Sequence, residues 1–373
     1  MRILVAPDKF AGTLTAVEAA DAIAEGWTRT APDDDVVTVP MADGGPGFVD
    51  VLHSCLGGDL LAVTVHGPLG TEVPATFLLA GDTAYIESAQ ACGLALLPHG
   101  PDGRDPEPGA AERASTFGVG ELVRHAIEAG ARRIVVGLGG SGTNDAGAGM
   151  LAALGATAHP SDALTGGPRG LATLTALDLE PARARARGVE LIAASDVDNP
   201  LLGLRGATNV FGAQKGIVAD DAKLAADGAL ARFSDLADRP LADEKGSGAA
   251  GGLGYALLLL GGRREEGFAT VAEAVDLADL VAGVDLVVTG EGKLDWQSMS
   301  GKVVSGVAAL AGPALRPCIV MAGAVQVGNR ELRANGIEAA YSMVDMVGTS
   351  ESFAYPRRSL AAVAERVAKT WSR

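Results

Sequence analysis

The chain of 373 residues has few cysteines, few histidines and few aromatic residues. Its three cysteines, Cys55, Cys92 and Cys318, show no metal-ligand spacing and form an odd set, which is typical of free thiols in a reducing compartment. The five histidines are scattered and form no H-E-x-x-H pattern. Neither a C-x-x-C pair nor a G-x-S-x-G turn occurs. These absences argue against chemistry built on any of those motifs.

Long apolar segments and an excess of basic residues are also lacking. No stretch offers about 20 unbroken apolar residues, so we expect no membrane span. The apolar run after Arg2 is too short for a secretory signal, and we therefore expect a cytoplasmic protein. The net charge of −16 argues against a nucleic-acid-binding surface. It leaves room for an anionic small molecule, because a local site can be positive on an acidic protein.

Glycine and small apolar residues are abundant instead. The chain has 51 glycines, and apolar residues make up 48% of it. The glycines cluster after short apolar runs, where a backbone turns tightly or approaches a ligand closely. Runs of this length are typical of strands buried on both faces in a parallel sheet. The predicted strands are Ile3–Ala6, Ile134–Leu138, Leu191–Ala194, Asp285–Thr289 and Cys318–Ala322.

Helical patterns alternate with these runs. Thr15 and Glu18 form a capping-box pattern, which predicts the start of a helix. Pro46 predicts the start of a second helix and Gly57 its end. Two further helices are predicted over Glu121–Ala129 and Ala146–Leu154. The alternation of strands and helices predicts an α/β architecture.

Five polar, glycine-rich segments adjoin the apolar runs, at the strand ends where open α/β sheets bind ligands. In the first, Asp8 and Lys9 stand between a strand and a helix, where backbone donors and a lysine favour an anion. An ordinary turn with a solvated lysine explains this segment equally well. In the second, Asp43 is followed by two glycines and either caps the next helix or faces a ligand.

The third segment, Gly137–Asp145, lies between a predicted strand and a predicted helix. Its glycines can bring successive backbone N–H groups around a phosphate, and we favour this interpretation over a purely structural turn. The candidate nucleotide-binding residues here are Gly139, Gly140, Ser141, Gly142, Thr143, Asn144 and Asp145. The segment also satisfies G-x-G-x-x-G, but no convincing strand precedes the acid that follows downstream, so a Rossmann dinucleotide site is rejected.

The fourth segment carries a pair of acids after the strand that ends at Ala194. Asp196 and Asp198 alternate along an extended chain, so both carboxylates can face the same side. Such a pair suits Mg²⁺, or one acid can bind metal while the other accepts a hydroxyl proton. An Asx-type turn before Pro200 explains Asn199 but not the two acids.

The fifth segment, Thr289–Lys302, is the richest in polar groups. We expect it to form a turn before another helix. Its candidate residues are Gly290, Glu291, Gly292, Lys293, Asp295 and Lys302. It is not a Walker A loop, because Val303 follows Lys302 where that motif requires Ser or Thr.

Lysine usage supports these segments as phosphate sites. The chain has seven lysines against 23 arginines, and four of the seven lie in or beside the segments: Lys9, Lys215, Lys293 and Lys302. Because arginine supplies the surface charge, a compact ammonium at a phosphate site is a reasonable use for the remaining lysines. Chance clustering is the alternative.

Together the segments resemble the type I bacterial glycerate kinases over essentially the whole chain. The shared stretches, in the order of that family, are APDKFAGTLTA, PMADGGPGF, HGPLG, STFGVGEL, VGLGGSGTNDAGAGML, ASDVDNPLLG, VFGAQKG, GAAGGLGYAL and TGEGKLDWQSMSGK. The glycine loop, the DVDNP segment and the GEG-to-GK segment are the most specific.

The resemblance implies ATP-dependent phosphorylation of D-glycerate, usually at the 2-hydroxyl, with Mg²⁺. It also implies two α/β domains. One is flavodoxin-like and takes residues 1–80 and 285–373. The other is inserted over residues 81–284 and has a core similar to restriction endonucleases.

On this basis each candidate residue has an expected role. ATP is held by the glycine loop of residues 139–145 and by Gly290, Glu291 and Gly292. Mg²⁺ is held by Asp196, Asp198 and Asp295, and Asp196 orients or deprotonates the hydroxyl. Lys215, Lys293 and Lys302 neutralise the phosphoryl group or grip the substrate carboxylate. Asp8, Lys9, Asp43 and Asn199 are expected to contact the substrate.

Two positions depart from the family pattern. The common D-S-F-K-G reads Asp8-Lys9-Phe10-Ala11-Gly12 here, so Ala11 stands at the lysine position and a lysine stands at Lys9. The common A-D-G-G-E-G has Pro46 in place of its glutamate, which leaves Asp43 as the local acid.

Two other classes of function stay open from the sequence. One is a dinucleotide-dependent oxidoreductase of a small hydroxy acid, and the other is a non-catalytic sugar-acid sensor on the same fold. The sequence also leaves undecided whether position 2 or 3 of the acid is phosphorylated, how broad the substrate range is, and whether the protein is a monomer or a homodimer.

Overall fold

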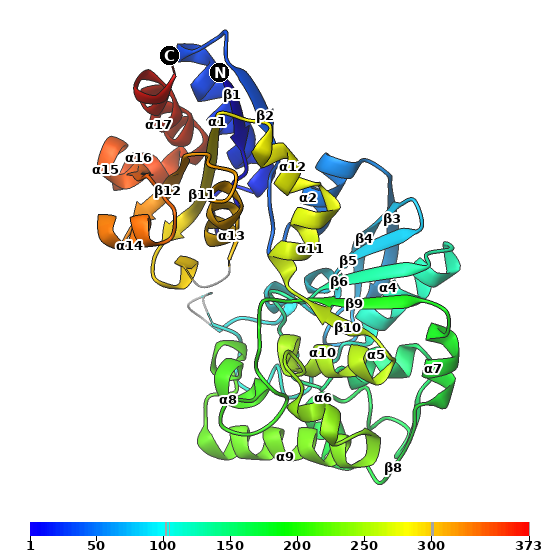
Figure 1. Ribbon diagram of the computed structural model, residues 1–373. Coiled ribbons are helices and arrows are strands. Elements are labelled where there is room, and N and C mark those ends of the chain that lie inside the picture. The colour runs from blue at the N-terminus through cyan, green and yellow to red at the C-terminus, as the bar shows by residue number, and fades with distance from the viewer. Residues whose placement is uncertain (101–102, 104, 300–301, 373) are drawn as a thin grey trace. The chain divides into compact units, whose positions relative to one another are not determined.

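The computed structural model describes residues 1–100, 103, 105–299 and 302–372 of a mixed α/β chain that divides into two compact units. Unit 1 contains Met1–Asp43, Asp50–Gly57 and Gly267–Arg373, and unit 2 contains Gly44–Val49 and Gly58–Glu266. Residues from both ends of the chain therefore build unit 1, whereas the middle of the chain builds unit 2 (Figure 1).

Unit 1 is built on a five-stranded parallel sheet with the order β13-β12-β11-β1-β2. Its strands are β1 (Arg2–Val5), β2 (Asp35–Thr38), β11 (Leu286–Leu294), β12 (Cys318–Val325) and β13 (Ala339–Ser342). Counted in chain order within the unit, the strand order is 2-1-3-4-5. The order reverses between β1 and β11, and in such sheets the loops leaving the carboxyl ends of those two strands open a crevice.

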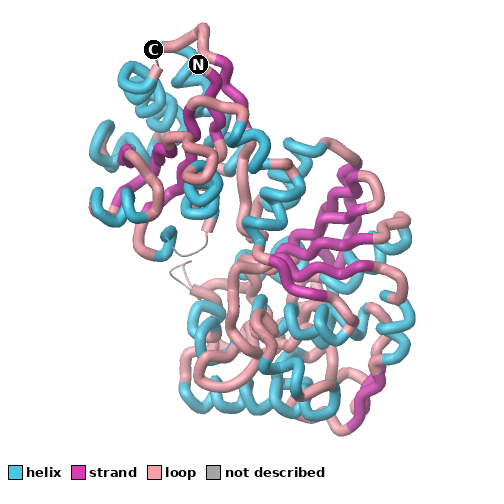
Figure 2. Tube along the Cα trace, in the orientation of Figure 1, coloured by secondary structure: helices cyan, strands magenta, loops and turns pink. Residues whose placement is uncertain are grey.

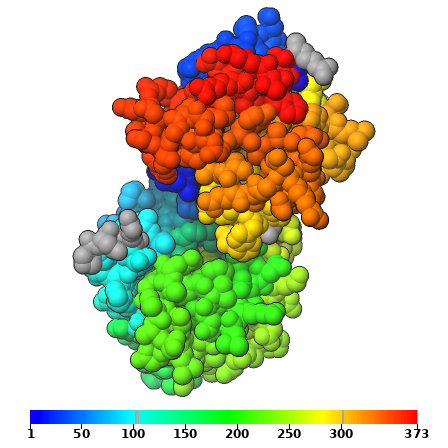
Figure 3. Space-filling model, turned by 90° about the vertical axis from the view of Figure 1, so that its left-hand side faces the viewer, coloured from blue at the N-terminus to red at the C-terminus, as the bar shows by residue number. Residues whose placement is uncertain are grey.

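Helices from the two ends of the chain pack together in unit 1. In α1 (Ala16–Thr30) and α17 (Pro356–Trp371), the side chains of Ile23, Trp27 and Val363 are buried in one apolar cluster. Figure 3 shows the red surface of α17 beside the blue surface of the N-terminal residues. The remaining helices are α2 (Phe48–Leu56), which crosses the division between the units, α11 (Gly267–Ala274), α12 (Leu277–Ala282), α13 (Val303–Ala311), α14 (Asn329–Ala334), α15 (Met343–Val347) and α16 (Thr349–Ala354).

Unit 2 is built on a six-stranded sheet with the order β10-β9-β6-β5-β4-β3, seen as neighbouring magenta strands in Figure 2. β3, β4 and β5 are antiparallel neighbours, whereas β5, β6, β9 and β10 run parallel. The strands are β3 (Asp59–His66), β4 (Glu72–Ala80), β5 (Thr83–Glu87), β6 (Arg133–Gly137), β9 (Glu190–Ala194) and β10 (Arg263–Glu265). A separate antiparallel pair is formed by β7 (Thr157–His159) and β8 (Ala176–Asp178).

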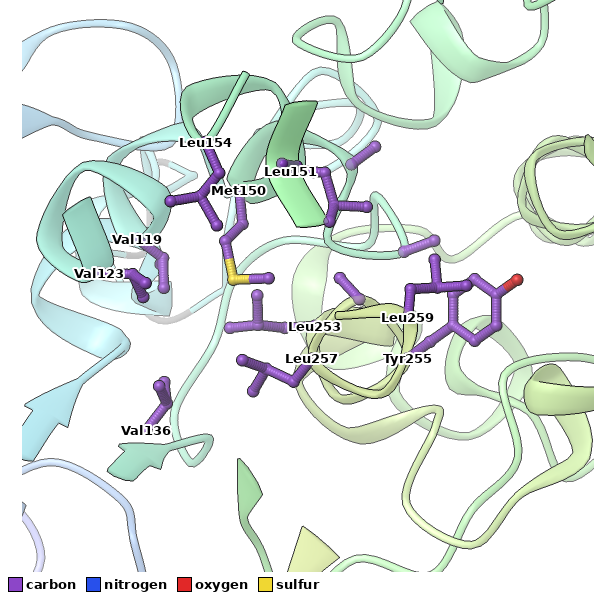
Figure 4. Packing of buried hydrophobic residues seen from close by; sticks show 14 of the residues in the cluster. Val119, Val123, Val136, Met150, Leu151, Leu154, Leu253, Tyr255, Leu257 and Leu259 are labelled. Carbon is purple, nitrogen blue, oxygen red and sulfur yellow. The ribbon is translucent and has the colours of Figure 1, made fainter. Parts of the chain in front are cut away.

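Helices of unit 2 enclose a large apolar core. Met150 of α5 lies among Val119 of α4, Val136 of β6 and Leu253 of α10, and all four side chains are fully buried (Figure 4). The helices are α3 (Ala89–Cys92), α4 (Phe117–Glu128), α5 (Ala148–Ala153), α6 (Gly167–Leu171), α7 (Glu180–Ala186), α8 (Ala207–Phe211), α9 (Asp220–Ala237) and α10 (Ala249–Leu259). Among the described residues, no helix combines the length and the apolar character needed to cross a membrane.

The five predicted strands are confirmed as β1, β6, β9, β11 and β12. Their starts lie within one residue of the predictions, but β11 and β12 run on to Leu294 and Val325. The parallel ladder between them continues to that pair, so residues 290–294 extend the strand where a turn was predicted. The prediction was wrong here because two glycines in the segment suggested a turn, whereas the neighbouring strand supplies hydrogen-bond partners.

The predicted helix starts are right in one case and early in another. The capping box of Thr15 and Glu18 is confirmed, with hydrogen bonds in both directions. The helix predicted from Pro46 begins only at Phe48, because Gly47 has a φ of 95°, a left-handed conformation that no helix contains. Its predicted end is confirmed, since the N–H of Gly57 donates to the carbonyl of His53 at 2.9 Å just after the helix.

The boundaries between the units differ from the predicted domain boundaries. β3 and β4 pair with β5, so residues 58–80 belong to unit 2 and not to the unit that contains the N-terminus. α11 and α12 belong to unit 1, so the second unit ends at Glu266 rather than at residue 284.

Candidate active site

A pocket of about 390 Å³ opens at the carboxyl ends of β1 and β11 in unit 1, where the strand order reverses. We call it the switch-point pocket. Such crevices are the usual ligand sites of open α/β sheets, and its volume lies in the range typical of small-molecule sites. Because all of its lining residues belong to unit 1, this unit alone builds it.

The loop after β1 is attached firmly to β11. The N–H of Ala6 donates to the carbonyl of Val288 at 2.7 Å, and the N–H of Asp8 donates to the carbonyl of Gly290 at 2.8 Å. The buried hydroxyl of Thr289 donates to the carbonyl of Ala6 at 2.8 Å. These bonds place the side chain of Asp8 beside the part of β11 that carries Glu291.

The lining of the switch-point pocket contains charged and apolar residues, and we call these two chemical sets the charged wall and the apolar wall. The charged wall contains Asp8, Lys9, Asp43, Glu291, Lys293 and Lys302. The apolar wall contains Phe10, Gly323, Ala324, Met343, Val344 and Phe353. Glu291 and Lys293 are two residues apart on β11, so their side chains point to the same face of the strand. Most residues predicted to bind substrate or nucleotide in the first, second and fifth segments are therefore brought together.

Ion pairs organise the charged wall. The ammonium of Lys9 lies 3.9 Å from Oδ1 of Asp8 and 3.7 Å from Oδ1 of Asp43. The backbone N–H of Lys9 also donates to Oδ1 of Asp8 at 2.7 Å. Asp43 thus serves the pocket and is not the N-cap of the next helix, which begins five residues later at Phe48.

Two carboxyl groups of this wall have raised pKa values. Burial raises the pKa of Asp8 to about 6, with Asp43 adding to the rise and Lys9 opposing it. Burial likewise raises the pKa of Glu291 to about 7, with Asp8 adding to the rise and a hydrogen bond from Ser298 opposing it. Acids tuned toward neutrality in a pocket are typical of functional sites.

Lys293 and Asp295 pair with each other at the edge of the pocket. Nζ of Lys293 lies 3.1 Å from Oδ2 of Asp295, and this partner lowers the pKa of the Asp295 carboxyl. Oδ1 of Asp295 accepts the N–H of Gln297 at 2.9 Å, which forms a short turn. Two further residues of the fifth segment, Ser300 and Gly301, lie outside the described residues.

The glycine loop of unit 2 is largely occupied by contacts within its own unit. The N–H of Gly139 donates to the carbonyl of Gly44 at 3.0 Å, and the N–H of Gly142 donates to the carbonyl of Cys92 at 2.7 Å. The N–H groups of Gly139 and Gly142 thus have acceptors within the protein, and a phosphate contact of this loop stays a prediction.

Asp145 and Asn144 at the end of that loop are core residues. The fully buried Asp145 carboxylate accepts from the N–H groups of Thr116, Gly147 and Gly149 and from the Thr116 hydroxyl, at 2.8 to 3.2 Å. The side-chain amide of Asn144 donates to the hydroxyl of Thr208 at 2.8 Å. Both side chains join distant segments inside unit 2, and their place at a nucleotide stays a prediction.

Lys215 is likewise an internal residue. Its side chain is 2% exposed, and its ammonium donates to the hydroxyl of Ser141 at 3.0 Å and to the carbonyl of Thr143 at 2.7 Å. Burial lowers the pKa of Lys215 to about 8. The ammonium of Lys215 is thus enclosed and holds the glycine loop, and its contact with the transferred phosphoryl stays a prediction. Gly140, Ser141 and Thr143 stay predictions as nucleotide contacts.

The pair of acids after β9 is not a pair in the structure. Asp198 lies 2.7 Å from Arg264 and 3.5 Å from Lys245, so two cations already neutralise it. The hydroxyl of Ser195 accepts the N–H of Val197 at 3.2 Å, which turns the chain between the two acids. The side-chain amide of Asn199 donates to the carbonyl of Arg205 at 2.8 Å, a turn contact that accounts for this residue without a substrate. Asp196 is half-buried and stays a prediction.

Mg²⁺ binding by Asp196, Asp198 and Asp295 stays a prediction. Asp198 and Asp295 are held by cationic partners, and no group of three or more His, Cys, Asp or Glu residues in the described part of the chain has metal-site geometry. Kinase sites commonly hold Mg²⁺ through substrate phosphates and one or two carboxylates, so such a cage is not required for this chemistry.

Sequence reasoning missed the apolar wall of the switch-point pocket. Met343, Val344 and Phe353 come from α15 and α16, far along the chain from Asp8. Apolar residues in helices normally suggest core packing, so no local signal marks them as pocket residues. Phe353 is nevertheless 68% exposed, which is unusual for a large aromatic side chain that serves only packing.

Comparison with known proteins agrees with a ligand site in this fold. The model of the glycerate kinase family matches residues 3–372. The chain is 42% identical to the glycerate kinase of Bacillus subtilis (strain 168), over 92% of this chain and 90% of that relative. It is 37% identical to the glycerate 2-kinase of Escherichia coli (strain K12), over 99% of this chain and 98% of that relative.

A solved structure gives the same result for the fold. The crystal structure of a protein provisionally described as glycerate kinase 2 from Salmonella typhimurium LT2 matches with a TM-score of 0.83 and 37% identity. The match covers 99% of this chain and 98% of that one. Such agreement over the full length distinguishes a kinase from an oxidoreductase or a non-catalytic sensor, and the chain belongs to the glycerate kinase family.

Proposed function

We propose that this enzyme transfers the terminal phosphoryl group of ATP to the 2-hydroxyl of D-glycerate. The observation that carries the proposal is the switch-point pocket, in which lysines and tuned carboxyl groups face one another at the strand ends of an open α/β sheet. The names of the relatives supply glycerate as the acceptor, and one of them is a glycerate 2-kinase.

The charged wall offers what phosphoryl transfer requires. The reaction depends mainly on positioning and on neutralising charge around the transferred group. Lys293 and Lys302 bring two ammonium groups to the pocket, and Lys9 brings a third that Asp8 and Asp43 hold in place. In our proposal these lysines bind the glycerate carboxylate and the ATP phosphates.

The apolar wall supports a nucleotide as the second ligand. A three-carbon acid fills only a small part of about 390 Å³ and has little apolar surface to place against Val344 and Phe353. An adenine ring has two flat faces of that kind, and aromatic side chains favour stacking on such rings. Mg²⁺ enters in this proposal as part of its complex with ATP.

We also propose a fold type for each unit and a cellular location for the protein. The strand order 2-1-3-4-5 of unit 1 supports a flavodoxin-like domain. For unit 2 we propose a core similar to restriction endonucleases, on the basis of the family resemblance alone. A cytoplasmic location is proposed from the composition of the chain, in which all three cysteines are free.

A coupled assay of ADP release tests the reaction. With Mg-ATP and D-glycerate we expect turnover in the range typical of kinases, roughly 1–100 per second. The control omits glycerate and reads any hydrolysis of ATP alone. Phosphorus NMR against authentic 2- and 3-phosphoglycerate identifies the product. Glycerate-independent ADP release, or none at all, would refute the proposed activity, whereas a 3-phosphoglycerate product would refute only the position.

A further inference from the structure

Glu291 is an acid of the switch-point pocket with a buried carboxylate oxygen to which no described residue donates a hydrogen bond. It lies on β11, and its neighbour across the ladder is Ala322 of β12. Its Oε1 atom is buried and makes no hydrogen bond with any residue that the structure describes, although the side chain lines the pocket. A buried carboxylate oxygen without a donor is costly, and such an atom in a native protein calls for an explanation in function or in a bound ligand.

The groups around Glu291 fit a proton acceptor. Asp8 and Asp295 place negative charge near it, and Lys302 places positive charge near it. The other charged residues that face the pocket are Lys9, Asp43 and Lys293. No titratable group of β12, α15 or α16 lines the described part of the pocket. Negative neighbours raise the affinity of a carboxylate for a proton, while lysines at the same wall can hold an anionic substrate beside it.

The protonation state of Glu291 also suits the task. Because its pKa is raised to about 7, the group carries a proton about half of the time at neutral pH. A general base works best when its pKa lies near the working pH, because it is then both deprotonated often enough and basic enough to take a proton.

We propose that Glu291 is the catalytic base that accepts the hydroxyl proton of glycerate; this inference rests on the proposed function. The glycerate oxygen forms a bond to the γ-phosphorus while the bond from that phosphorus to the β–γ bridging oxygen breaks. ADP leaves with the electron pair of the broken bond. The hydroxyl proton passes to a carboxylate oxygen of Glu291 and is released to solvent after the product leaves.

Asp196 is the rival residue for this role. Its assignment rested on a pair of carboxylates, one for a metal and one for the hydroxyl, but Asp198 is paired with Arg264 and Lys245 instead. These ion pairs engage Asp198 elsewhere, and Asp196 stays the rival because its Oδ2 atom is buried as Oε1 of Glu291 is. Variants of the two residues distinguish the alternatives.

The experiment measures the pH dependence of kcat/KM from pH 5.5 to 9 for wild type, E291Q and D196N. We expect wild type to lose activity on the acid side with an apparent pKa near 7, because protonated Glu291 cannot act as a base. The kcat/KM of E291Q should be about 10²–10⁴-fold lower than that of wild type, which is the usual contribution of a general base. The activity that remains should not show this loss at low pH, which we call the acid limb of the pH profile. D196N should keep the limb.

A third variant, D8N, tests whether Asp8 raises the pKa of Glu291. Since the charge of Asp8 raises the pKa of Glu291, D8N should move the acid limb to lower pH even where it reduces the rate. If Glu291 had only a structural role, D8N would not change the pH at which kcat/KM falls on the acid side. ADP binding by calorimetry and the melting temperature of E291Q should stay close to wild type, which separates a lost base from a lost fold.

The outcomes separate this inference from the proposed function. If wild type turns over glycerate while E291Q keeps both its acid limb and a rate within tenfold of wild type, Glu291 is not the base. If D196N alone loses the limb, Asp196 is the base. If wild type fails to phosphorylate glycerate at all, the proposed function is wrong and the role of Glu291 falls with it.

Discussion

At the scale of one residue, the buried ammonium of Lys215 stabilises a distant loop through hydrogen bonds. Its ammonium joins the hydroxyl of Ser141 and the carbonyl of Thr143, 74 and 72 residues away in sequence. Both partners belong to the glycine loop after β6. Lys215 was predicted to neutralise a phosphoryl group because the chain has few lysines and this one stands beside the glycine-rich segments. The sequence carries no sign that this one is enclosed.

The enclosed Lys215 predicts a specific pH dependence of stability. Its pKa is about 8 in the folded protein and about 10.4 in the unfolded chain. Between these values the unfolded state binds more protons, so the free energy of unfolding contributed by this residue rises with pH. We expect the stability of wild type relative to K215M to increase by about 1–3 kcal/mol from pH 7.5 to 10. Urea unfolding at both pH values measures this difference.

A matched lysine provides the control for that measurement. Lys369 on α17 has a side chain that is 63% exposed, so K369M should show no change in relative stability over the same pH range. A flat difference for K215M would mean that the buried ammonium keeps its ordinary affinity for the proton.

At the scale of elements, small residues decide how closely helices approach. A Cβ atom at Gly120 of α4 would lie 2.4 Å from the carbonyl oxygen of Met150 on α5. The two helices therefore pack with backbone against backbone at this point, and Met150 fills the space beside them (Figure 4). Gly120 was part of the predicted family resemblance, but only the packing shows why the position has no side chain.

Substitution of Gly120 tests this packing. We expect G120A to lower the free energy of unfolding by about 1–3 kcal/mol, because the neighbouring atoms are backbone and cannot turn aside. The control is Gly228 of α9, where an added Cβ meets nothing within 4 Å. There G228A should raise stability by up to about 1 kcal/mol through helix propensity. Chemical unfolding of both variants measures the difference, and equal effects would contradict the close approach of α4 and α5.

The elements that could be predicted are those whose signals are local. Apolar runs marked five strands, and the capping box marked the start of α1. The errors fall where tertiary partners override local preference. β11 continues through Gly290 and Gly292 because β12 lies beside it, and α2 starts late because Gly47 takes a left-handed conformation.

At the scale of the whole molecule, residues from both chain ends form unit 1 and the middle of the chain forms most of unit 2. The contacts of α17 with α1 hold the C-terminal part of unit 1 to the N-terminal part. Each part contributes strands to one sheet, so neither completes the core without the other.

A buried charge in α17 tests this division. Val363 is fully buried against α1, so V363D should cost several kcal/mol through an unpaired charge in the apolar cluster. In hydrogen exchange we expect faster exchange in both residues 1–43 and residues 267–373, and little change in residues 58–266. Equal loss of protection across the chain would contradict two separate units. The control V189D adds the same charge at a half-buried site in unit 2 and should spare unit 1.

The sequence by itself determined the α/β class, the positions of five strands and several residues that meet in the switch-point pocket. Asp8, Lys9, Asp43 and Glu291 could be found because a polar residue just after or near the end of a buried strand has few other places to lie. The tertiary structure decided the rest. It enclosed Lys215 and Asp145, paired Asp198 with Arg264 and added Phe353 to the pocket, because each of these contacts depends on a distant segment that no local pattern identifies.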